Sequence, residues 1–155
     1  FDDYRMEGRT YRYYEGETVY PFGHGLSYTA FAYGPVTVTP ASAGAEGGIR
    51  VEASLRNTGD RPGDEVAQLY LTFPDRPGVP NIALRGFQRV RLAPGESKRL
   101  SFDLSPRDLS AVNPEGVRMV MAGAYTVHVG SGQPETGAPV SNGTFEVART
   151  VELPR

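Results

Sequence analysis

The chain has 155 residues, a formal net charge of −2 and no cysteine, so disulfides are excluded as a stabilising device. This length suits a single domain. No basic run indicates a nucleic-acid partner, and no apolar stretch approaches the roughly 20 residues that cross a membrane. Its 19 glycines and 13 prolines, together with scarce helix-period patterns, favour an all-β sandwich or barrel.

Residues 1–26 form an irregular, aromatic-rich N-terminal arm. Residues 1–5 lack the basic start and apolar run of a signal peptide, and the chain is expected to be a fragment. Disordered segments are usually poor in aromatic residues, so we expect the arm to dock on a surface. The candidate contact residues are Tyr11, Tyr13, Tyr14, Tyr20, Phe22 and His24.

Alternation of apolar and polar residues predicts the first strands. It covers 31–33, 36–38 and 49–55, as is typical of strands with one face in the core. The small residues at 41–48 predict a loop, and the Asn, Gly and Pro residues at 57–63 predict a turn.

A central strand is predicted at 66–73, which is apolar on both faces apart from Gln68 and Thr72. Both faces of this strand should therefore be covered. Residues 84–92 predict another strand, interrupted at Gly86.

The second half of the chain continues this pattern around one short helix. Ser105, Pro106 and Asp108 form a helix-start signal, because the serine can cap and proline suits the first helical position. A long loop is predicted at 131–143. Further strands are predicted at 100–104, 117–121, 123–129 and 145–147.

These elements predict an immunoglobulin-like β-sandwich of about seven strands, with a turn about every 8–12 residues. The folded domain should span 27–149, with a short tail at 150–155. Its expected core residues are Leu69, Leu71, Phe102, Tyr125 and Val127.

The acidic residues of the domain predict no catalytic site. Asp60, Asp64 and Glu65 form the one close acidic cluster, but they fall on a turn and a strand start, where solvated acids are ordinary. Nothing in their sequence context suggests a raised pKa. We expect a structural role, with Asp64 capping backbone N–H groups of the turn.

No metal site or cofactor is predicted. The two histidines, His24 and His128, are far apart, and a metal site needs three or four ligands. His24 has two open roles, a polar contact with a neighbouring domain or a hydrogen bond to the local backbone. His128 is expected to face solvent.

Four stretches of the chain, in the same order, resemble the C-terminal region of glycoside hydrolase family 3. Residues 20–29, YPFGHGLSYT, are similar to that family's segment leading into its third domain. The other three stretches are 57–70, which includes NTG and GDEVAQLY, 84–97, which includes LRGFQRV and LAPGES, and 123–130, GAYTVHVG. The resemblance implies a fibronectin type III-like domain.

The resemblance also implies a parent enzyme, an exo-acting retaining β-glycosidase that removes terminal β-D-glucosyl or β-D-xylosyl residues. In this family the nucleophile and the acid/base lie in two domains upstream, so the chain is expected to hold no catalytic residue. The implied partners are those catalytic domains of the same polypeptide, and the implied location of the parent is secreted or periplasmic.

Two other classes of function stay open on the sequence. A carbohydrate-binding module would present its aromatic rings as a platform for sugars, although the arm's aromatic residues do not alternate along one strand. An immunoglobulin-type adhesion domain is disfavoured because the chain has neither cysteine nor tryptophan.

Overall fold

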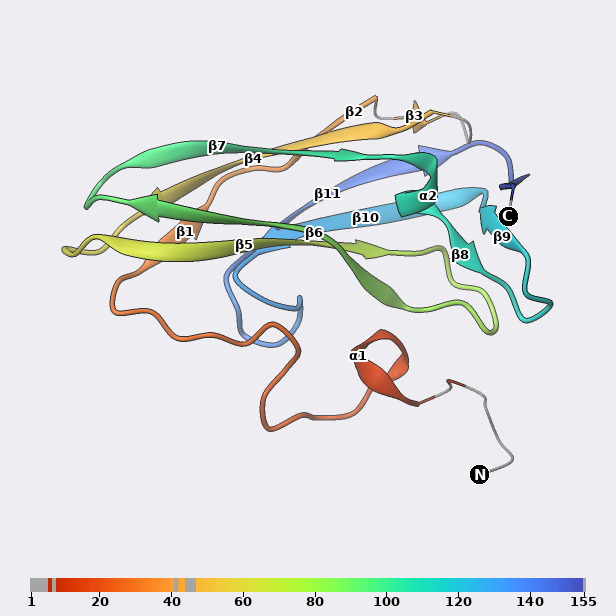
Figure 1. The fold of residues 1–155 in the computed structure, drawn as a ribbon, viewed down its shortest axis with the longest axis horizontal. Coiled ribbons are helices and arrows are strands. Elements are labelled where there is room, and N and C mark those ends of the chain that lie inside the picture. The colour runs from red at the N-terminus through yellow and green to blue at the C-terminus, as the bar shows by residue number, and fades with distance from the viewer. Residues whose placement is uncertain (1–5, 7, 41, 44–46, 155) are drawn as a thin grey trace.

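The computed structural model describes residues 6, 8–40, 42–43 and 47–154 as a β-sandwich with a small third sheet at one end (Figure 1). The predicted all-β class is confirmed. The part of the arm at residues 1–5 and most of the centre of the loop predicted at 41–48 lie outside the described residues.

The first sheet is built around β4 (Ile49–Asn57). β7 (Ser97–Leu104) pairs with one edge of β4, while β1 (Phe31–Tyr33) and β2 (Thr37–Thr39) pair in turn with its other edge, all antiparallel. Buried and more exposed residues alternate along β4, as its sequence predicts.

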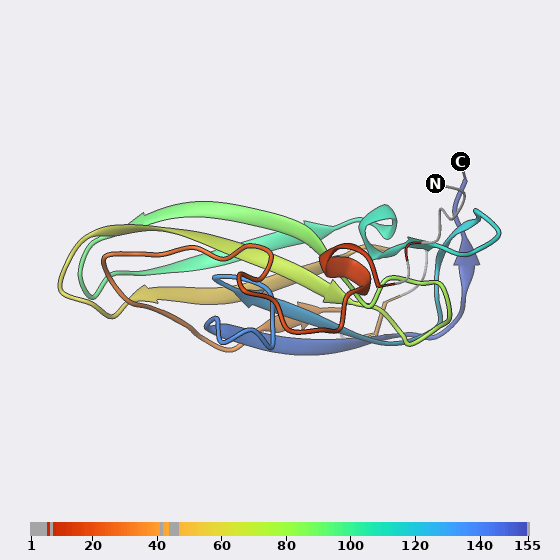
Figure 2. The ribbon, with the colours of Figure 1, turned by 90° about the horizontal axis from the view of Figure 1, so that it is seen from below.

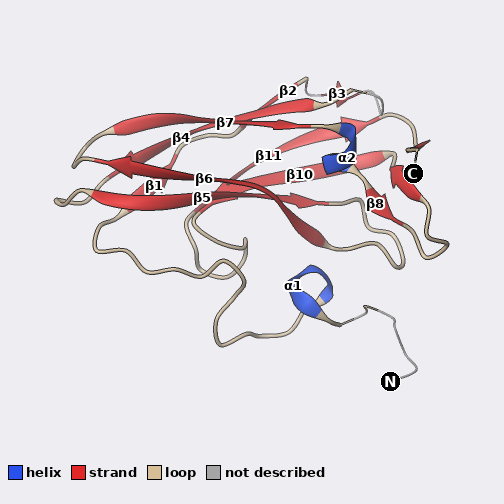
Figure 3. Ribbon diagram, viewed as in Figure 1, coloured by secondary structure: helices blue, strands red, loops and turns tan. Residues whose placement is uncertain are grey.

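The second sheet has the strand order β3-β11-β10-β5-β6 (Figure 3). Its central strand β5 (Gly63–Thr72) lies between β10 (Gly123–Gly130) and β6 (Ile82–Leu92), both antiparallel to it. β11 (Val140–Val147) follows β10, and β3 (Ser42–Ala43) pairs with β11 in parallel.

Two loop predictions are wrong in this sheet. β3 lies within the loop predicted at 41–48, and β11 begins at Val140, inside the loop predicted at 131–143. Both segments are held by pairing with a neighbouring strand rather than by an apolar pattern of their own.

The third sheet closes one end of the sandwich. It joins β8 (Ala111–Val112), β9 (Arg118–Val120) and β12 (Val151–Glu152), so the predicted tail contributes a short strand.

A single helical turn precedes this third sheet. α2 (Pro106–Leu109) carries the predicted capping box. The Ser105 N–H donates to Asp108 Oδ2 at 2.8 Å, and the Asp108 N–H donates to Ser105 Oγ at 3.3 Å.

The arm runs along the outer side of the second sheet and reaches β1 (Figures 1 and 2). Among the described residues of the arm, the one regular element is α1 (Thr10–Tyr13), a single helical turn that the sequence analysis missed. Four residues are too few for a helical period to be visible in the sequence.

A buried asparagine holds the turn predicted at 57–63. The Asn57 amide N–H groups donate to Arg61 O at 2.7 Å and to Leu92 O at 3.1 Å. Its Oδ1 accepts from the Thr29 hydroxyl at 2.8 Å and from the Gly59 N–H at 3.0 Å. Every polar group of this side chain is therefore satisfied, as burial requires.

The interruption predicted at Gly86 is a register shift between β5 and β6. Leu69 pairs with Gly86 and Tyr70 pairs with Leu84, which leaves Arg85 as the extra residue of a bulge. A Cβ atom at Gly86 would lie 3.0 Å from the Phe102 ring. The Phe102 ring of β7 thus packs against the backbone of β6 at the bulge.

All five predicted core residues are buried. They belong to the one apolar cluster between the two sheets. The Tyr125 ring also stacks on Phe145, with centroids 5.0 Å apart, and its hydroxyl donates to Met121 O at 3.0 Å.

We expect Phe102→Ala to lower the free energy of unfolding by about 3–5 kcal/mol, the usual loss for a buried aromatic ring. Urea unfolding of the 155-residue chain measures this. Ser101→Ala, on the exposed face of the same strand, is the control and should change stability by about 0.5 kcal/mol or less. A loss of under about 1 kcal/mol for Phe102→Ala would contradict this packing.

Candidate functional site

The arm folds back onto the second sheet, where two of its aromatic rings stack. The Tyr11 ring lies parallel to the Phe22 ring, with centroids 4.0 Å apart, and meets Tyr70 of β5 edge-on at 6.3 Å. The Tyr11 hydroxyl accepts a hydrogen bond from the Leu84 N–H of β6 at 3.1 Å. The sandwich itself therefore holds this part of the arm.

Gln68 ties three segments of the chain together. Its side-chain amide donates to Gly23 O in the arm and to Ser131 O after β10, each at 3.0 Å. Its Oε1 accepts from the Tyr70 hydroxyl at 2.6 Å. Burial raises the pKa of Tyr70, and the nearby Tyr11 raises it further, so this hydroxyl stays a donor at neutral pH.

The arm and the residues that directly follow it expose large apolar side chains, with Leu26 94% and Tyr28 96% exposed. The strands beneath add an exposed valine and an exposed phenylalanine on the same outer face as Gln68. We call these side chains the apolar face; its members are Tyr20, Leu26, Tyr28, Val66 and Phe87.

Four of the six predicted contact residues form two pairs. Tyr11 stacks on Phe22, as described, and the ring of Tyr20 lies 5.2 Å from that of His24. His24 is exposed, and its backbone N–H donates to Pro21 O at 3.1 Å.

The other two predicted residues lie apart from these pairs. Tyr13 is half-buried, with the Arg12 guanidinium carbon 5.8 Å from its ring centroid. Tyr14 is exposed, and its hydroxyl donates to Glu17 O at 3.3 Å.

The sequence analysis missed Leu26 and Tyr28, which are among the most exposed apolar side chains of the described chain. Leu26 is the last residue of the predicted arm but is not aromatic, and Tyr28 lies where the β pattern begins, so neither was named as a contact residue. Their alternation was the available signal, but it does not say whether that face is covered.

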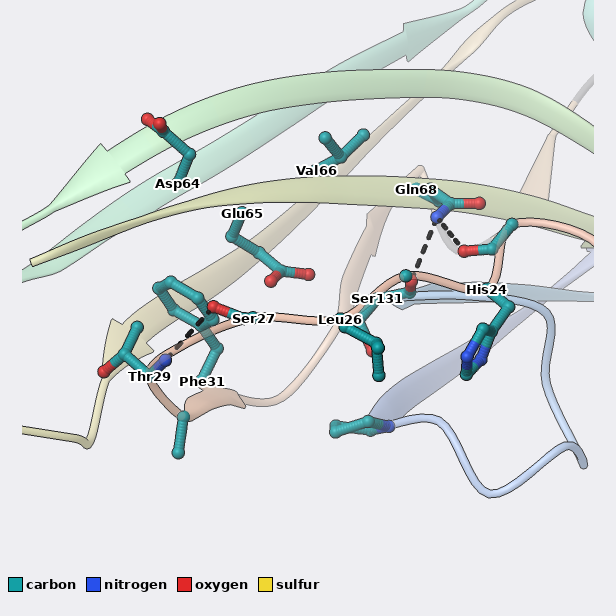
Figure 4. A pocket seen from close by; sticks show the side chains of 14 residues that line it. His24, Leu26, Ser27, Thr29, Phe31, Asp64, Glu65, Val66, Gln68 and Ser131 are labelled. Atoms are coloured by element: carbon teal, nitrogen blue, oxygen red, sulfur yellow. Dashed lines mark hydrogen bonds between the residues drawn. The ribbon is translucent and has the colours of Figure 1, made fainter.

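Asp64 and Glu65 point to opposite faces of β5, as alternation on a strand requires (Figure 4). Asp64 forms ion pairs with Arg89 at 3.1 Å and Arg91 at 3.4 Å, rather than capping the turn. Glu65 is buried and accepts a hydrogen bond from the Tyr33 hydroxyl at 2.8 Å. The two carboxyl groups therefore do not face each other as a hydrolytic pair would.

The expectation of ordinary pKa values in this cluster is wrong for Glu65. Burial raises the pKa of its carboxyl group, and the hydrogen bond from Tyr33 opposes this rise only in part. The pKa of the Tyr33 hydroxyl is also raised, first by burial and then by the Glu65 charge. A strand start can be buried when another segment covers it, which local sequence does not show.

The expectation that His128 faces solvent is also wrong. The ring is half-buried, with Nε2 2.9 Å from the Thr72 hydroxyl oxygen of the neighbouring strand. Burial lowers the pKa of His128, and Glu135 opposes this. Within the described part of the chain, no group of three or more His, Cys, Asp or Glu side chains could hold a metal ion.

Comparison with known proteins identifies the type of this β-sandwich. Residues 65–133 match the family model of the fibronectin type III-like domain. Residues 65–133 therefore form a fibronectin type III-like domain. The probable β-glucosidase D of Aspergillus niger is 38% identical to it over 157 residues, which cover 88% of this chain and 20% of that protein.

Further relatives agree with this assignment of the fibronectin type III-like domain. A β-xylosidase of Formosa agariphila is 38% identical over 78% of this chain and 17% of its own length. The structure of β-glucosidase 3B from Thermotoga neapolitana in complex with α-D-glucose has a TM-score of 0.76 and 34% identity, over 90% of this chain and 19% of that one. The resemblance to glycoside hydrolase family 3 is confirmed, and the chain spans about a fifth of its curated relatives.

The raised pKa of Glu65 predicts a pH dependence of stability. The folded domain holds this proton more tightly than the unfolded chain, so this contribution is full below the ordinary value of 4.5 and is lost as pH rises through the raised value. Glu65→Gln keeps an acceptor for Tyr33 and removes the charge. We expect the variant to gain stability relative to the unaltered domain between about pH 4 and about pH 7 in urea unfolding.

Asp64→Asn is the matched control, because it removes the neighbouring carboxylate on the opposite face of the strand. It should not reproduce the gain. A Glu65→Gln domain less stable than the unaltered one at about pH 7 would contradict the burial argument.

Proposed function

We propose that this chain is the non-catalytic C-terminal accessory domain of a longer exo-acting, retaining β-glycosidase that hydrolyses terminal β-D-glucosyl or β-D-xylosyl residues. The supporting observation is coverage: the β-glucosidase and the β-xylosidase match 88% and 78% of this chain but only 20% and 17% of their own lengths. The β-glucosidase and the β-xylosidase are equally similar to the chain, at 38% identity each. Both sugars therefore stay in the proposal.

The role of the domain in that enzyme is to stabilise the catalytic domains by packing against them. The contact surface is the apolar face together with the arm. Exposed apolar patches on soluble proteins usually mark an interface. Tyr11, Tyr13 and Phe22 would support this surface from below, whereas Tyr14, Tyr20 and His24 would contact the neighbouring domains.

A carbohydrate-binding module is the alternative, and the arrangement of the rings favours it less. A sugar platform needs the flat face of an aromatic ring open to solvent. Tyr11 and Phe22 instead turn faces towards each other, at 4.0 Å and 7°. Retention of the isolated chain on insoluble glucan or xylan would favour the alternative.

The isolated chain should not hydrolyse aryl β-glucosides or aryl β-xylosides. Asp64 and Glu65 lie on opposite faces of β5, so these two carboxyl groups do not form a hydrolytic pair. Release of nitrophenol from the two substrates measures this. Turnover that disappears in Asp64→Asn or Glu65→Gln would show that the cluster is catalytic.

Replacing Tyr20 and Tyr28 together with serine should lower the melting temperature of the full-length enzyme, because it removes apolar side chains from the proposed contact surface. Both side chains are largely exposed in this chain, at 74% and 96%, so the isolated domain should melt almost unchanged. Scanning calorimetry of both proteins gives the comparison.

The control for this pair is Val112→Ser, which changes an exposed apolar residue in the third sheet. It should leave the melting of the full-length enzyme unchanged. If the double tyrosine variant of the full-length enzyme also melts like the unaltered protein, the packing role is wrong.

A further inference from the structure

A pocket of about 510 Å³ lies between the first half of β5 and residues 23–31, which run from the end of the arm to the first residue of β1 (Figure 4). It exists because β10 pairs only with residues 68–72 of β5. Beside the first half of β5, the arm takes the place that a strand would occupy, without a ladder of backbone hydrogen bonds.

Glu65 projects from β5 into this pocket (Figure 4). The residue is only 8% exposed, and its Oε1 accepts the hydrogen bond from Tyr33. Its second carboxylate oxygen has no hydrogen bond within the described chain. The pocket thus contains a buried acid with one oxygen left to bind.

The described residues that line the pocket supply no arginine or lysine. The other titratable lining residues are His24 and Asp64. His24 lies across the pocket, beyond Leu26, and Asp64 points away to its own arginine partners (Figure 4). A largely buried carboxylate is costly unless it is paired, and none of the described lining residues brings a cation to Glu65.

The walls of the pocket suit a long basic side chain. Leu26, Phe31 and Pro139 provide apolar surface for an aliphatic stem. A guanidinium or ammonium group carries only donors, which the free carboxylate oxygen of Glu65 can accept.

We propose that this pocket receives an arginine or lysine side chain from a part of the polypeptide outside this chain, which pairs with Glu65. The inference rests on the proposed accessory role. One of the pocket's wall residues, Leu26, belongs to the apolar face, so a domain packed against Leu26 would reach the opening. The relatives are about five times longer than the matched segment, which leaves ample chain to supply the cation.

The chemistry of the pocket can be tested on the 155-residue chain with methylguanidinium chloride. The carboxyl ¹³C signal of Glu65 should shift and saturate at roughly 1–100 mM, as for a weak single-group ligand. Asp64→Asn should keep this response, whereas Glu65→Gln should weaken binding, followed through backbone amide signals around the pocket, at least about tenfold.

Three further ligands make this result specific. Tetramethylammonium chloride at equal ionic strength should give no saturable shift, because it has no donor. D-glucose and D-xylose should give none either. Saturable shifts with a sugar but not with methylguanidinium would overturn the cation site in favour of a carbohydrate site.

The source of the cation is tested in the full-length enzyme by whether Glu65→Gln raises or lowers its melting temperature. Glu65→Gln should lower its melting temperature, although the same change stabilises the isolated chain at neutral pH, because only the longer protein supplies the partner. Asp64→Asn should not lower it. A Glu65→Gln enzyme that melts at the same or a higher temperature would show that no basic side chain occupies the pocket.

The experiments distinguish failure of the packing role from failure of the Glu65 pairing. If the Tyr20 and Tyr28 double variant destabilises the full-length enzyme but Glu65→Gln does not, packing of the apolar face stands and the Glu65 pairing is wrong. If neither change destabilises it, the packing role itself is wrong.

Discussion

The constraint on which this domain depends is that the second half of β5 must be covered on both faces. Its inward side chains, including Leu69 and Leu71, enter the core between the sheets, while Gln68 and Tyr70 on the other face are also buried. A sheet with one solvated face would leave those two side chains in water. Here the arm covers them, and their polar groups reach backbone carbonyls of the arm and of Ser131. The arm is therefore part of the structure of the domain.

This covering is incomplete, and the incomplete parts are where function is proposed. The arm follows no strand register, so it satisfies Gln68 and Tyr70 but leaves a pocket beside Glu65. Its outward side chains have no layer above them in this chain. An exposed apolar face beside an unbalanced buried carboxylate is the surface expected of a domain that packs against a larger neighbour.

Much of the fold could be predicted because local patterns and packing agree. The alternation in β4, β7 and β10, the double-sided apolar run in β5 and the capping box of α2 all lead to elements that are present. The prediction of strands failed where pairing with a neighbouring strand, rather than the local pattern, decides whether a strand forms. β3 and the start of β11 have weak patterns and exist through their neighbours, while α1 is too short to show a period.

The sequence by itself determined the class of fold, the buried residues of the main strands and the resemblance to a family whose enzymes are much longer. These follow from period-two alternation and from ordered motifs, which are properties of short stretches of chain. Only the tertiary structure decided how the candidate site is arranged. In the folded chain Tyr11 stacks on Phe22, His128 is half-buried, and Leu26 and Tyr28 are exposed. The Glu65 side chain points into a pocket, away from Asp64. The reason is physical: whether a strand face or a carboxyl group is covered depends on segments distant in sequence, and here the covering segment is an arm without a period of its own.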